Sequence, residues 1–435
     1  YVIRRLLRRA VRYGKVLGME RPFLHELVSV VKEIMGEHYH ELVEKESFIQ
    51  TVIRNEEERF HETLNEGLDI LASFIDQAKA EGRTTISGDD AFKLYDTYGF
   101  PLDLTEDFAS EHGFDVDREG FEQAMEAQRQ RARAARQEAS SMTVQGGPLS
   151  EFKEESEFVG YDQLEVSEAT VIAVIQDDQM TDAAGENESC MVLLDRTPFY
   201  AESGGQVSDR GTISNEHMQA VVEEVGKAPH GQHVHTVQVL KGTLRVGDKV
   251  RAAVQADMRE NIIKNHTATH LLHKALKEVL GTHANQAGSL VAPERLRFDF
   301  SHFGAVTEEE LKEIETKVNE QIWKNIPLTI DYMPLSEAKA IGAMALFGEK
   351  YGDIVRVVQI SDYSIELCGG CHVDSTGQIG LFKIVGESGI GSGVRRIEAV
   401  TGKFAYQFVE EQLQLLKTVA AGLKSSIQDA PQRLE

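Results

Sequence analysis

The spacing of apolar residues changes along this chain, and that change restricts its possible folds more than any other feature. Up to about residue 140 apolar positions recur at three- and four-residue steps, which is typical of amphipathic helices. From about 153 to 256, short runs such as ATVIAVIQ, CMVLLD and HVHTVQV indicate strands, with Gly, Asn and Asp between them. From 257 to about 402 the two patterns mix. A chain of 435 residues with such changes requires several domains.

The order of these patterns predicts a multidomain fold in four parts. We expect an α-helical region over residues 1–148, a small antiparallel β-barrel over 149–256, and an α+β domain with a sheet packed against helices over 257–402. The segment MTVQGGPLSE is the predicted first boundary. Residues 403–435 are predicted to form a C-terminal helix, as a linker or the start of a coiled coil through which the chain can self-associate.

The composition is that of a globular protein without membrane spans or a disulfide framework. It is 41% hydrophobic and 27% charged, and no stretch approaches the roughly 20 apolar residues of a membrane span, so we expect no membrane partner. Three cysteines argue against a disulfide framework and favour the reducing cytoplasm. The sequence begins inside a helical pattern without an initiator Met, which indicates a fragment of a larger protein.

A basic stripe opens the sequence, although the net charge is −25. The first fifteen residues contain no acid, and at about 100° per residue their arginines cover one side of a helix. Such a face is either solvated and paired with acids or binds a polyanion. Because the stripe looks uncompensated in an acidic chain, we expect it to bind a phosphate backbone. The arginines are Arg4, Arg5, Arg8, Arg9 and Arg12.

Two histidine- and cysteine-containing pairs supply the residues of a metal site. His266 and His270 are four apart on a predicted helix, which places both imidazoles on one face. About a hundred residues later, CGGCH contains Cys368 and His372 with the same spacing. Together the pairs offer three nitrogens and one sulfur, a complete tetrahedral set for zinc.

Other interpretations of these residues are weaker. A zinc protease of the H-E-x-x-H type requires a glutamate where this chain has Thr267. The C-x-x-C-H pattern of c-type haem attachment lacks an export context. Cys371 is an alternative to Cys368 as ligand, but it is adjacent to His372, which is poor geometry for chelation. His273 and His283 are further histidines near the first pair.

Several motifs together resemble the alanyl-tRNA synthetase family. HTATHLLHKALKEVLGTHANQAGSLV, RFDFSHF, ELCGGCHV and GSGVRRIEAVTG resemble its editing domain, while YVIRRLLRRAVRYGKVLG, LYDTYGFPLDLT and FYAESGGQVSDRG are similar to its tRNA-recognition and barrel regions. The resemblance implies that His266, His270, Cys368 and His372 bind one Zn²⁺ per chain. The family usually has Thr at the position of Cys371.

The resemblance also implies an activity, namely hydrolysis of misacylated Ser-tRNA(Ala) and Gly-tRNA(Ala). An apolar pocket separates alanine from glycine or serine by only about 1–3 kcal/mol, so a second site must remove errors. Candidate catalytic residues are Gln286 and Thr267; helix back-bonding is the alternative for Thr267 and Thr269. We find no counterpart of the class II core, which uses ATP and Mg²⁺, so we assign alanine ligation to the longer parent protein.

The resemblance names tRNA(Ala) as the partner, through its acceptor stem and aminoacylated 3′ end. The arginine stripe is expected on acceptor-stem phosphates, and Asp96 near the G·U wobble pair. Glycine loops can bring backbone N–H groups close to phosphate. The loop residues expected near the RNA end are Gly204, Gly205, Arg395 and Arg396.

Two alternatives remain open from the sequence. One is a free-standing deacylase acting in trans, although such proteins lack the long helical region at 1–140. The other is a non-catalytic RNA-binding module with structural zinc. The sequence also does not decide whether zinc activates water or only positions the tRNA end, since four protein ligands leave no open position.

Overall fold

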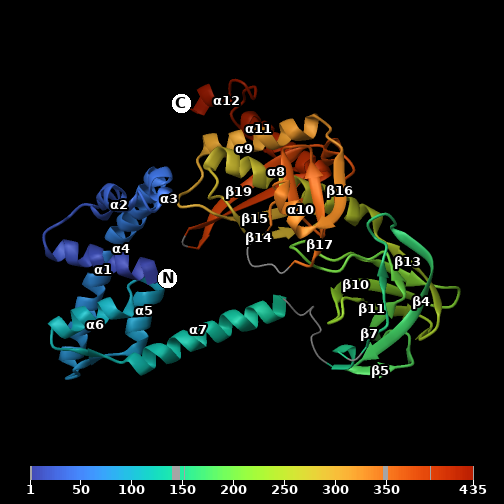
Figure 1. Ribbon diagram of the computed structural model, residues 1–435, viewed down its shortest axis with the longest axis horizontal. Coiled ribbons are helices and arrows are strands. Elements are labelled where there is room, and N and C mark those ends of the chain that lie inside the picture. The colour runs from blue at the N-terminus through green and yellow to red at the C-terminus, as the bar shows by residue number, and fades with distance from the viewer. Residues whose placement is uncertain (1, 140–146, 151, 346–350, 392, 435) are drawn as a thin grey trace. The chain divides into compact units, whose positions relative to one another are not determined.

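The computed structural model describes residues 2–139, 147–150, 152–345, 351–391 and 393–434. Contacts between residues divide the chain into two compact units, residues 1–140 and 141–435 (Figure 1). The boundary predicted within MTVQGGPLSE falls mostly on residues outside the described part.

The first unit is helical, as predicted. Its core lies between α4 and the shorter helices, and the buried positions of α4 follow one stripe that includes Phe60, Leu64 and Leu71. Ser87 caps α5 by accepting a hydrogen bond from the Asp90 amide at 3.2 Å. The elements are α1 (Val2–Val16), α2 (Leu27–Met35), α3 (His40–Glu44), α4 (Glu46–Ala80), α5 (Gly88–Tyr98), α6 (Leu102–Glu111), α7 (Arg118–Ala139) and the parallel pair β1 (Thr85–Ile86) and β2 (Asp115–Val116).

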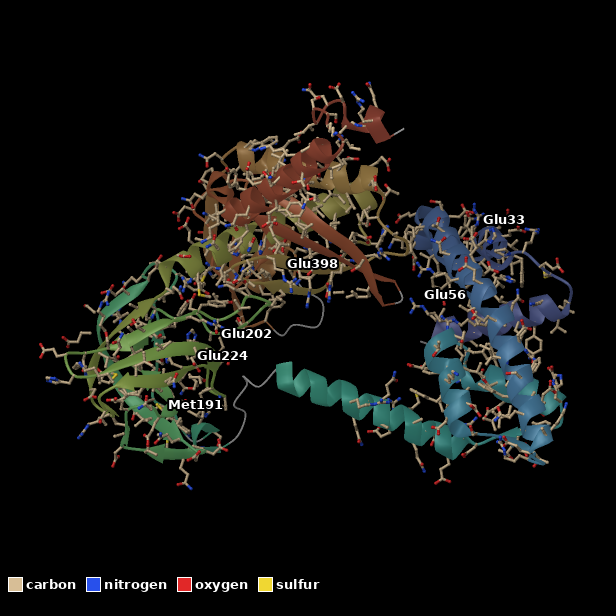
Figure 2. All side chains as sticks on the ribbon, turned by 180° about the vertical axis from the view of Figure 1, so that it is seen from behind. Glu33, Glu56, Met191, Glu202, Glu224 and Glu398 are labelled. Carbon is tan, nitrogen blue, oxygen red and sulfur yellow. The ribbon has the colours of Figure 1, made fainter. Side chains whose placement is uncertain are left out.

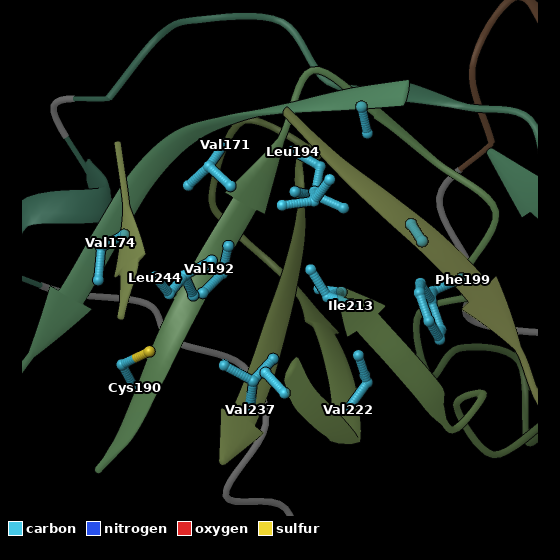
Figure 3. Packing of buried hydrophobic residues seen from close by; sticks show 14 of the residues in the cluster. Val171, Val174, Cys190, Val192, Leu194, Phe199, Ile213, Val222, Val237 and Leu244 are labelled. Atoms are coloured by element: carbon cyan, nitrogen blue, oxygen red, sulfur yellow. The ribbon is translucent and has the colours of Figure 1, made fainter. Parts of the chain in front are cut away.

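The second unit begins with a closed barrel of antiparallel strands. The strand order is β13-β9-β10-β11-β7-β4, and β13 pairs with both β9 and β4, which closes the sheet. Its interior is filled by alternate side chains such as Val192, Ile213 and Val237 (Figure 3). Its strands are β4 (Glu165–Gln176), β7 (Ser189–Leu194), β9 (Gly211–Ser214), β10 (Gln219–Lys227), β11 (His233–Lys241) and β13 (Lys249–Val254).

Short strands accompany the barrel. β5 extends the sheet beyond β4, and the other four form two separate pairs, β3 with β8 and β6 with β12. These strands are β3 (Glu157–Phe158), β5 (Gln179–Thr181), β6 (Ala183–Ala184), β8 (Arg196–Thr197) and β12 (Leu244–Arg245).

The rest of the second unit is an α+β arrangement. α8 (Ala256–Leu280) and α9 (Glu308–Trp323) pack together on the sheet β14-β15-β20-β19 (Figure 1), and their apolar side chains share one core with it. A second antiparallel sheet has the order β16-β17-β18. The strands are β14 (Gln286–Val291), β15 (Leu296–Ser301), β16 (Leu328–Pro334), β17 (Ile354–Ile360), β18 (Ser364–Leu367), β19 (Phe382–Gly391) and β20 (Val394–Thr401).

The remaining helices are α10 (Leu335–Ala340), α11 (Gly402–Gly422) and α12 (Ala430–Leu434). α11 agrees with the predicted C-terminal helix and exposes apolar side chains, among them Tyr406, Leu415 and Val419. Among the helices of the described residues, none combines the length and apolarity that a membrane span requires.

A buried ion pair joins α8 to the barrel. The Arg259 guanidinium is 4% exposed and donates three hydrogen bonds to the carboxylate of Asp209, which is 1% exposed. Arg259 also donates to the Pro198 carbonyl at 3.1 Å. The barrel and the α+β part are therefore packed into one unit, and their predicted division near residue 256 stays a prediction.

Candidate metal centre

In the second unit, the CGGCH segment lies against helix α8. His266 and His270 lie one turn apart on α8, with ring centroids separated by 5.4 Å. The CGGCH segment follows the end of β18 and brings Cys368 and His372 against them. The His372 ring centroid lies 4.5 Å from that of His266 and 4.6 Å from that of His270.

The four side chains suit a tetrahedral cation. Their donor atoms all lie within 4.8 Å of one another. Cys368 Sγ is 3.4 Å from His266 Nε2 and 3.3 Å from His372 Nε2. Zinc bonds of about 2.0–2.1 Å to nitrogen and about 2.3 Å to sulfur place tetrahedral donors about 3.3–3.6 Å apart. The donor set and its spacing therefore fit Zn²⁺.

Burial favours the neutral form of these groups. It lowers the pKa of His266 to about 3, and it lowers the pKa of His270 and of His372 as well. All three imidazoles are therefore neutral at neutral pH, and each offers a lone pair. Burial also raises the pKa of the Cys368 thiol to about 12.

Gln206 contacts the Nδ1 side of His266, away from the group. Its Oε1 lies 2.7 Å from His266 Nδ1 and accepts from the Cys371 amide at 2.9 Å. Because an amide oxygen only accepts, we assign the proton to Nδ1, which leaves Nε2 facing the group. Gln206 is fully buried and lies in the SGGQ loop. The sequence singled out this loop for RNA and gave no sign that its glutamine reaches a histidine.

Thr267 contacts the Nδ1 side of His372. Its Oγ1 accepts from the Val373 amide at 3.2 Å and lies 3.0 Å from His372 Nδ1. Thr267 is fully buried, and its hydroxyl contacts His372 of the group and the Val373 amide. Thr269, by contrast, donates to the Asn265 carbonyl of its own helix at 2.8 Å.

Glu366 lies behind His270. Its Oε2 is 3.8 Å from His270 Nδ1, and its Oε1 is 3.4 Å from His273 Nδ1. Both His273 and Glu366 are buried. His273 is therefore part of the surroundings of His270 and lies outside the four-donor group.

The glycines and Cys371 complete the CGGCH segment. A Cβ on Gly370 would overlap the His266 ring, so only glycine allows this approach. Cys371 is buried beside Gln206 and Arg259 and is not among the four clustered donors.

Gln286 and the SGGQ loop meet at β14. Gln286 Nε2 donates to Ser289 Oγ at 3.1 Å. Gly205, with φ of 83°, lies against Ser289, where a Cβ would collide, while Gly204 has open space around it. The loop is fixed to β14 by the Val291 amide, which donates to the Gly205 carbonyl at 2.7 Å.

The arginine stripe of α1 faces acids of its own unit, so the expectation that it is uncompensated was wrong. The N···O distances run from 2.7 to 4.0 Å, and Arg12 is only 3% exposed. The acids lie on α4 and α6, far away in the sequence; Figure 2 labels one of them, Glu56. The pairs are Arg4–Glu56, Arg8–Glu56, Arg5–Asp103, Arg9–Asp103, Arg9–Asp107, Arg12–Asp107 and Arg12–Glu111.

The other charged residues expected near RNA also have protein partners. Asp96 on α5 accepts a hydrogen bond from Gln128. Arg395 forms two hydrogen bonds with Glu387, each 2.6 Å long. Arg396 pairs with Asp299 at 2.7 and 2.9 Å.

Comparison with known proteins places this arrangement in a family. Residues 1–258 match the model described as tRNA synthetases class II (A). Residues 355–398, which include Cys368 and His372, match the Threonyl and Alanyl tRNA synthetase second additional domain. Because the first match covers more than half of it, the chain belongs to the class II tRNA synthetases. That match gives no support to the expectation that the class II core is absent.

Curated relatives indicate which branch of the family the chain resembles. It is 62% identical over 435 residues to an alanine–tRNA ligase of Geobacillus thermodenitrificans. It is 61% identical over 436 residues to that of Halalkalibacterium halodurans and 59% over 434 residues to that of Bacillus subtilis. All of the chain is covered, but only 49–50% of each relative. The chain thus spans about half the length of the curated relatives it matches.

Proposed function

We propose that the second unit hydrolyses the ester bond of Ser-tRNA(Ala) and Gly-tRNA(Ala). The observation that carries this proposal is the convergence of His266, His270, Cys368 and His372, with donor atoms within 4.8 Å of one another. It is supported by the match of residues 355–398 to the second additional domain of threonyl and alanyl synthetases.

The four side chains would hold one Zn²⁺. With four protein ligands it would position the tRNA end, and it would act as a Lewis acid on a carbonyl or water only if one ligand gave up its place. Gln206 keeps the proton of His266 on Nδ1, and Thr267 contacts Nδ1 of His372, so that Nε2 of both imidazoles faces the site. Thr267 thereby enters the proposal as a positioning residue. Gln286, on β14, is the candidate for orienting the substrate or a water. Polar groups that bond a serine hydroxyl would be left unpaired by alanine, which protects the correct product.

The test measures deacylation of radiolabelled Ser-tRNA(Ala) and Gly-tRNA(Ala). Cys368→Ala should abolish hydrolysis and stoichiometric zinc binding. Cys371→Thr is the matched control, because it removes a thiol from the same segment but outside the donor group; it should keep both. Full deacylation by metal-depleted protein would overturn the metal's role. Loss of fold on chelation, with no hydrolysis by the intact protein, would favour an RNA-binding module.

We propose that the longer protein ligates alanine to tRNA(Ala) with ATP and Mg²⁺, and that the chain alone does not. The support is the 59–62% identity to alanine–tRNA ligases, each about twice as long. Incubation with ATP, alanine and tRNA(Ala) should give no charging by this chain. Measurable charging would show that the aminoacylation site lies within residues 1–435.

We propose that tRNA(Ala) contacts the arginine stripe and Asp96 with its acceptor stem, and Gly204, Gly205, Arg395 and Arg396 near its 3′ end. Since the arginines are engaged by carboxylates, RNA phosphates must replace those acids. Binding should therefore be weak and should fall with added salt. The composition favours the cytoplasm as the location of this reaction.

A further inference from the structure

The backbone of the CGGCH segment is held by side chains from elsewhere in the unit. Arg356 Nη1 donates to the Cys368 carbonyl at 2.8 Å and to the Gly370 carbonyl at 2.9 Å. The Tyr161 hydroxyl donates to the Gly369 carbonyl between them at 2.7 Å. The three successive carbonyls of the segment therefore all accept hydrogen bonds from either Arg356 or Tyr161.

The two side chains also support each other. The Arg356 guanidinium carbon lies 4.1 Å from the centroid of the Tyr161 ring, within the range of a cation–π contact. Arg356 comes from β17, next to the metal segment, whereas Tyr161 follows β3 in the barrel part, 208 positions before Gly369. Both line a cavity of about 760 Å³ that also reaches Cys371 and His372.

We infer that Arg356 and Tyr161 are positioning residues that clamp the CGGCH segment, so that the barrel part helps to set the metal affinity of the site. This inference rests on the proposed function, because it assumes that Cys368 and His372 bind a cation.

The chemistry of the segment explains why a clamp is needed. Gly369 and Gly370 have no Cβ, so this stretch has more backbone freedom than any other residue type would allow. Gly370 cannot be replaced, since it packs on the His266 ring. The spacing between Cys368 and His372 then depends on outside contacts. Arg356 Nη1 donates to both carbonyls while its planar guanidinium lies over the Tyr161 ring, and the flexible ammonium of a lysine does not reproduce this stacked arrangement.

The experiment measures Co²⁺ binding, because the visible spectrum of Co²⁺ reports its ligands and geometry independently of hydrolysis. Tyr161→Phe removes one hydrogen bond and keeps the ring; Arg356→Lys keeps the charge, and Arg356→Gln removes it. Affinities for Zn²⁺ and Co²⁺ should fall about 10- to 100-fold, which is the usual effect of removing a hydrogen bond that supports the metal ligands. The Co²⁺ spectrum should broaden or shift in both Arg356 variants.

The matched control is Tyr332→Phe. Tyr332 lines the same cavity but is 64% exposed, and within the described part of the chain its hydroxyl makes no hydrogen bond to the CGGCH segment. This variant should bind Co²⁺ like the wild type.

The outcomes separate the clamp from the metal site itself. Unchanged affinity and spectrum in Tyr161→Phe and Arg356→Gln, with normal wild-type binding, would overturn the clamp alone. Failure of the wild-type protein to bind Co²⁺ or Zn²⁺ stoichiometrically would overturn the metal site and the clamp with it. If circular dichroism shows that Arg356→Gln is unfolded, Tyr161→Phe and Arg356→Lys decide the question.

Discussion

At the scale of single residues, the buried pair Arg259–Asp209 controls how firmly α8 is attached to the barrel. Asp209→Asn should destabilise the second unit by about 3–5 kcal/mol, because it leaves the Arg259 guanidinium buried without its counter-charge. Urea denaturation followed by circular dichroism measures this change.

The control is a pair of the same chemistry at the surface. Arg251 and Glu165 form two hydrogen bonds of 2.6 Å across β13 and β4, but their side chains are 52% and 46% exposed. Glu165→Gln should shift the denaturation midpoint far less, because water solvates the charge that remains. Equal losses in the two variants would contradict the role given to burial.

Two threonines of α8 make a second comparison. Thr267→Val removes the hydroxyl that holds His372 and should weaken zinc binding about 10- to 100-fold. Thr269→Val removes a hydroxyl that bonds only to its own helix, so zinc affinity should stay near the wild-type value. Competition with a chromophoric chelator measures both. A larger effect at Thr269 would count against the assignment.

The limits of prediction at this scale follow from distance along the chain. Each half of the donor set is a local pattern of four-residue spacing, so the sequence alone points to all four residues. Their supporting side chains come from other elements: Gln206 is 60 positions from His266, and Tyr161 is 208 from Gly369. No periodic pattern connects such pairs. The acids opposite the arginine stripe were missed for the same reason.

At the scale of elements, the barrel shows which strands can be predicted from apolar runs in the sequence and which cannot. The strands β4, β7 and β11 contain the apolar runs ATVIAVIQ, CMVLLD and HVHTVQV, from which strands were predicted. β9 is four residues long, GTIS, and its glycine hid it from any such pattern. Yet β9 pairs with both β10 and β13 and is required for closure.

The barrel should lose stability in acid because of a histidine on β11. His235 is fully buried, with Nδ1 2.9 Å from the Val192 carbonyl and Nε2 2.7 Å from Thr197 Oγ1. Burial lowers the pKa of His235 from 6.5 to about 4. The folded state therefore disfavours the protonated form. The contribution of this histidine to stability is complete above pH 6.5 and is lost as the pH falls toward 4.

Replacing that histidine tests the effect. Between pH 7 and pH 5 the urea midpoint of the wild type should fall more than that of His235→Gln, which cannot take up a proton. His233 on the same strand has a pKa lowered to about 4, chiefly by burial, so part of the pH dependence should remain in the variant. Parallel curves for both proteins would contradict the prediction.

At the scale of the whole molecule, metal removal should affect only one of the two compact units. A chelator should lower the melting temperature of the second unit, by about 2–4 °C for each kcal/mol of stabilisation lost. The first unit, which contains none of the four donors, should melt unchanged. Differential scanning calorimetry with and without EDTA measures this. In Cys368→Ala the EDTA effect should disappear.

The exposed apolar side chains of α11 concern the whole molecule as well. We propose that this helix mediates self-association, and light scattering on the intact chain and on a Leu415→Lys variant would show it. A dimer should become a monomer in the variant, since Leu415 is 59% exposed on the helix.

The separation of Cys368 from His266 by 102 positions also affects how the protein is synthesised. At about 5–20 residues per second, a ribosome makes the second pair of donors roughly 5–20 s after the first. During that interval the nascent chain contains His266 and His270, but Cys368 and His372 have not yet been made. Any ion captured then has only half of its final coordination. If the four side chains hold Zn²⁺ as proposed, the complete site can form only after the CGGCH segment has left the exit tunnel.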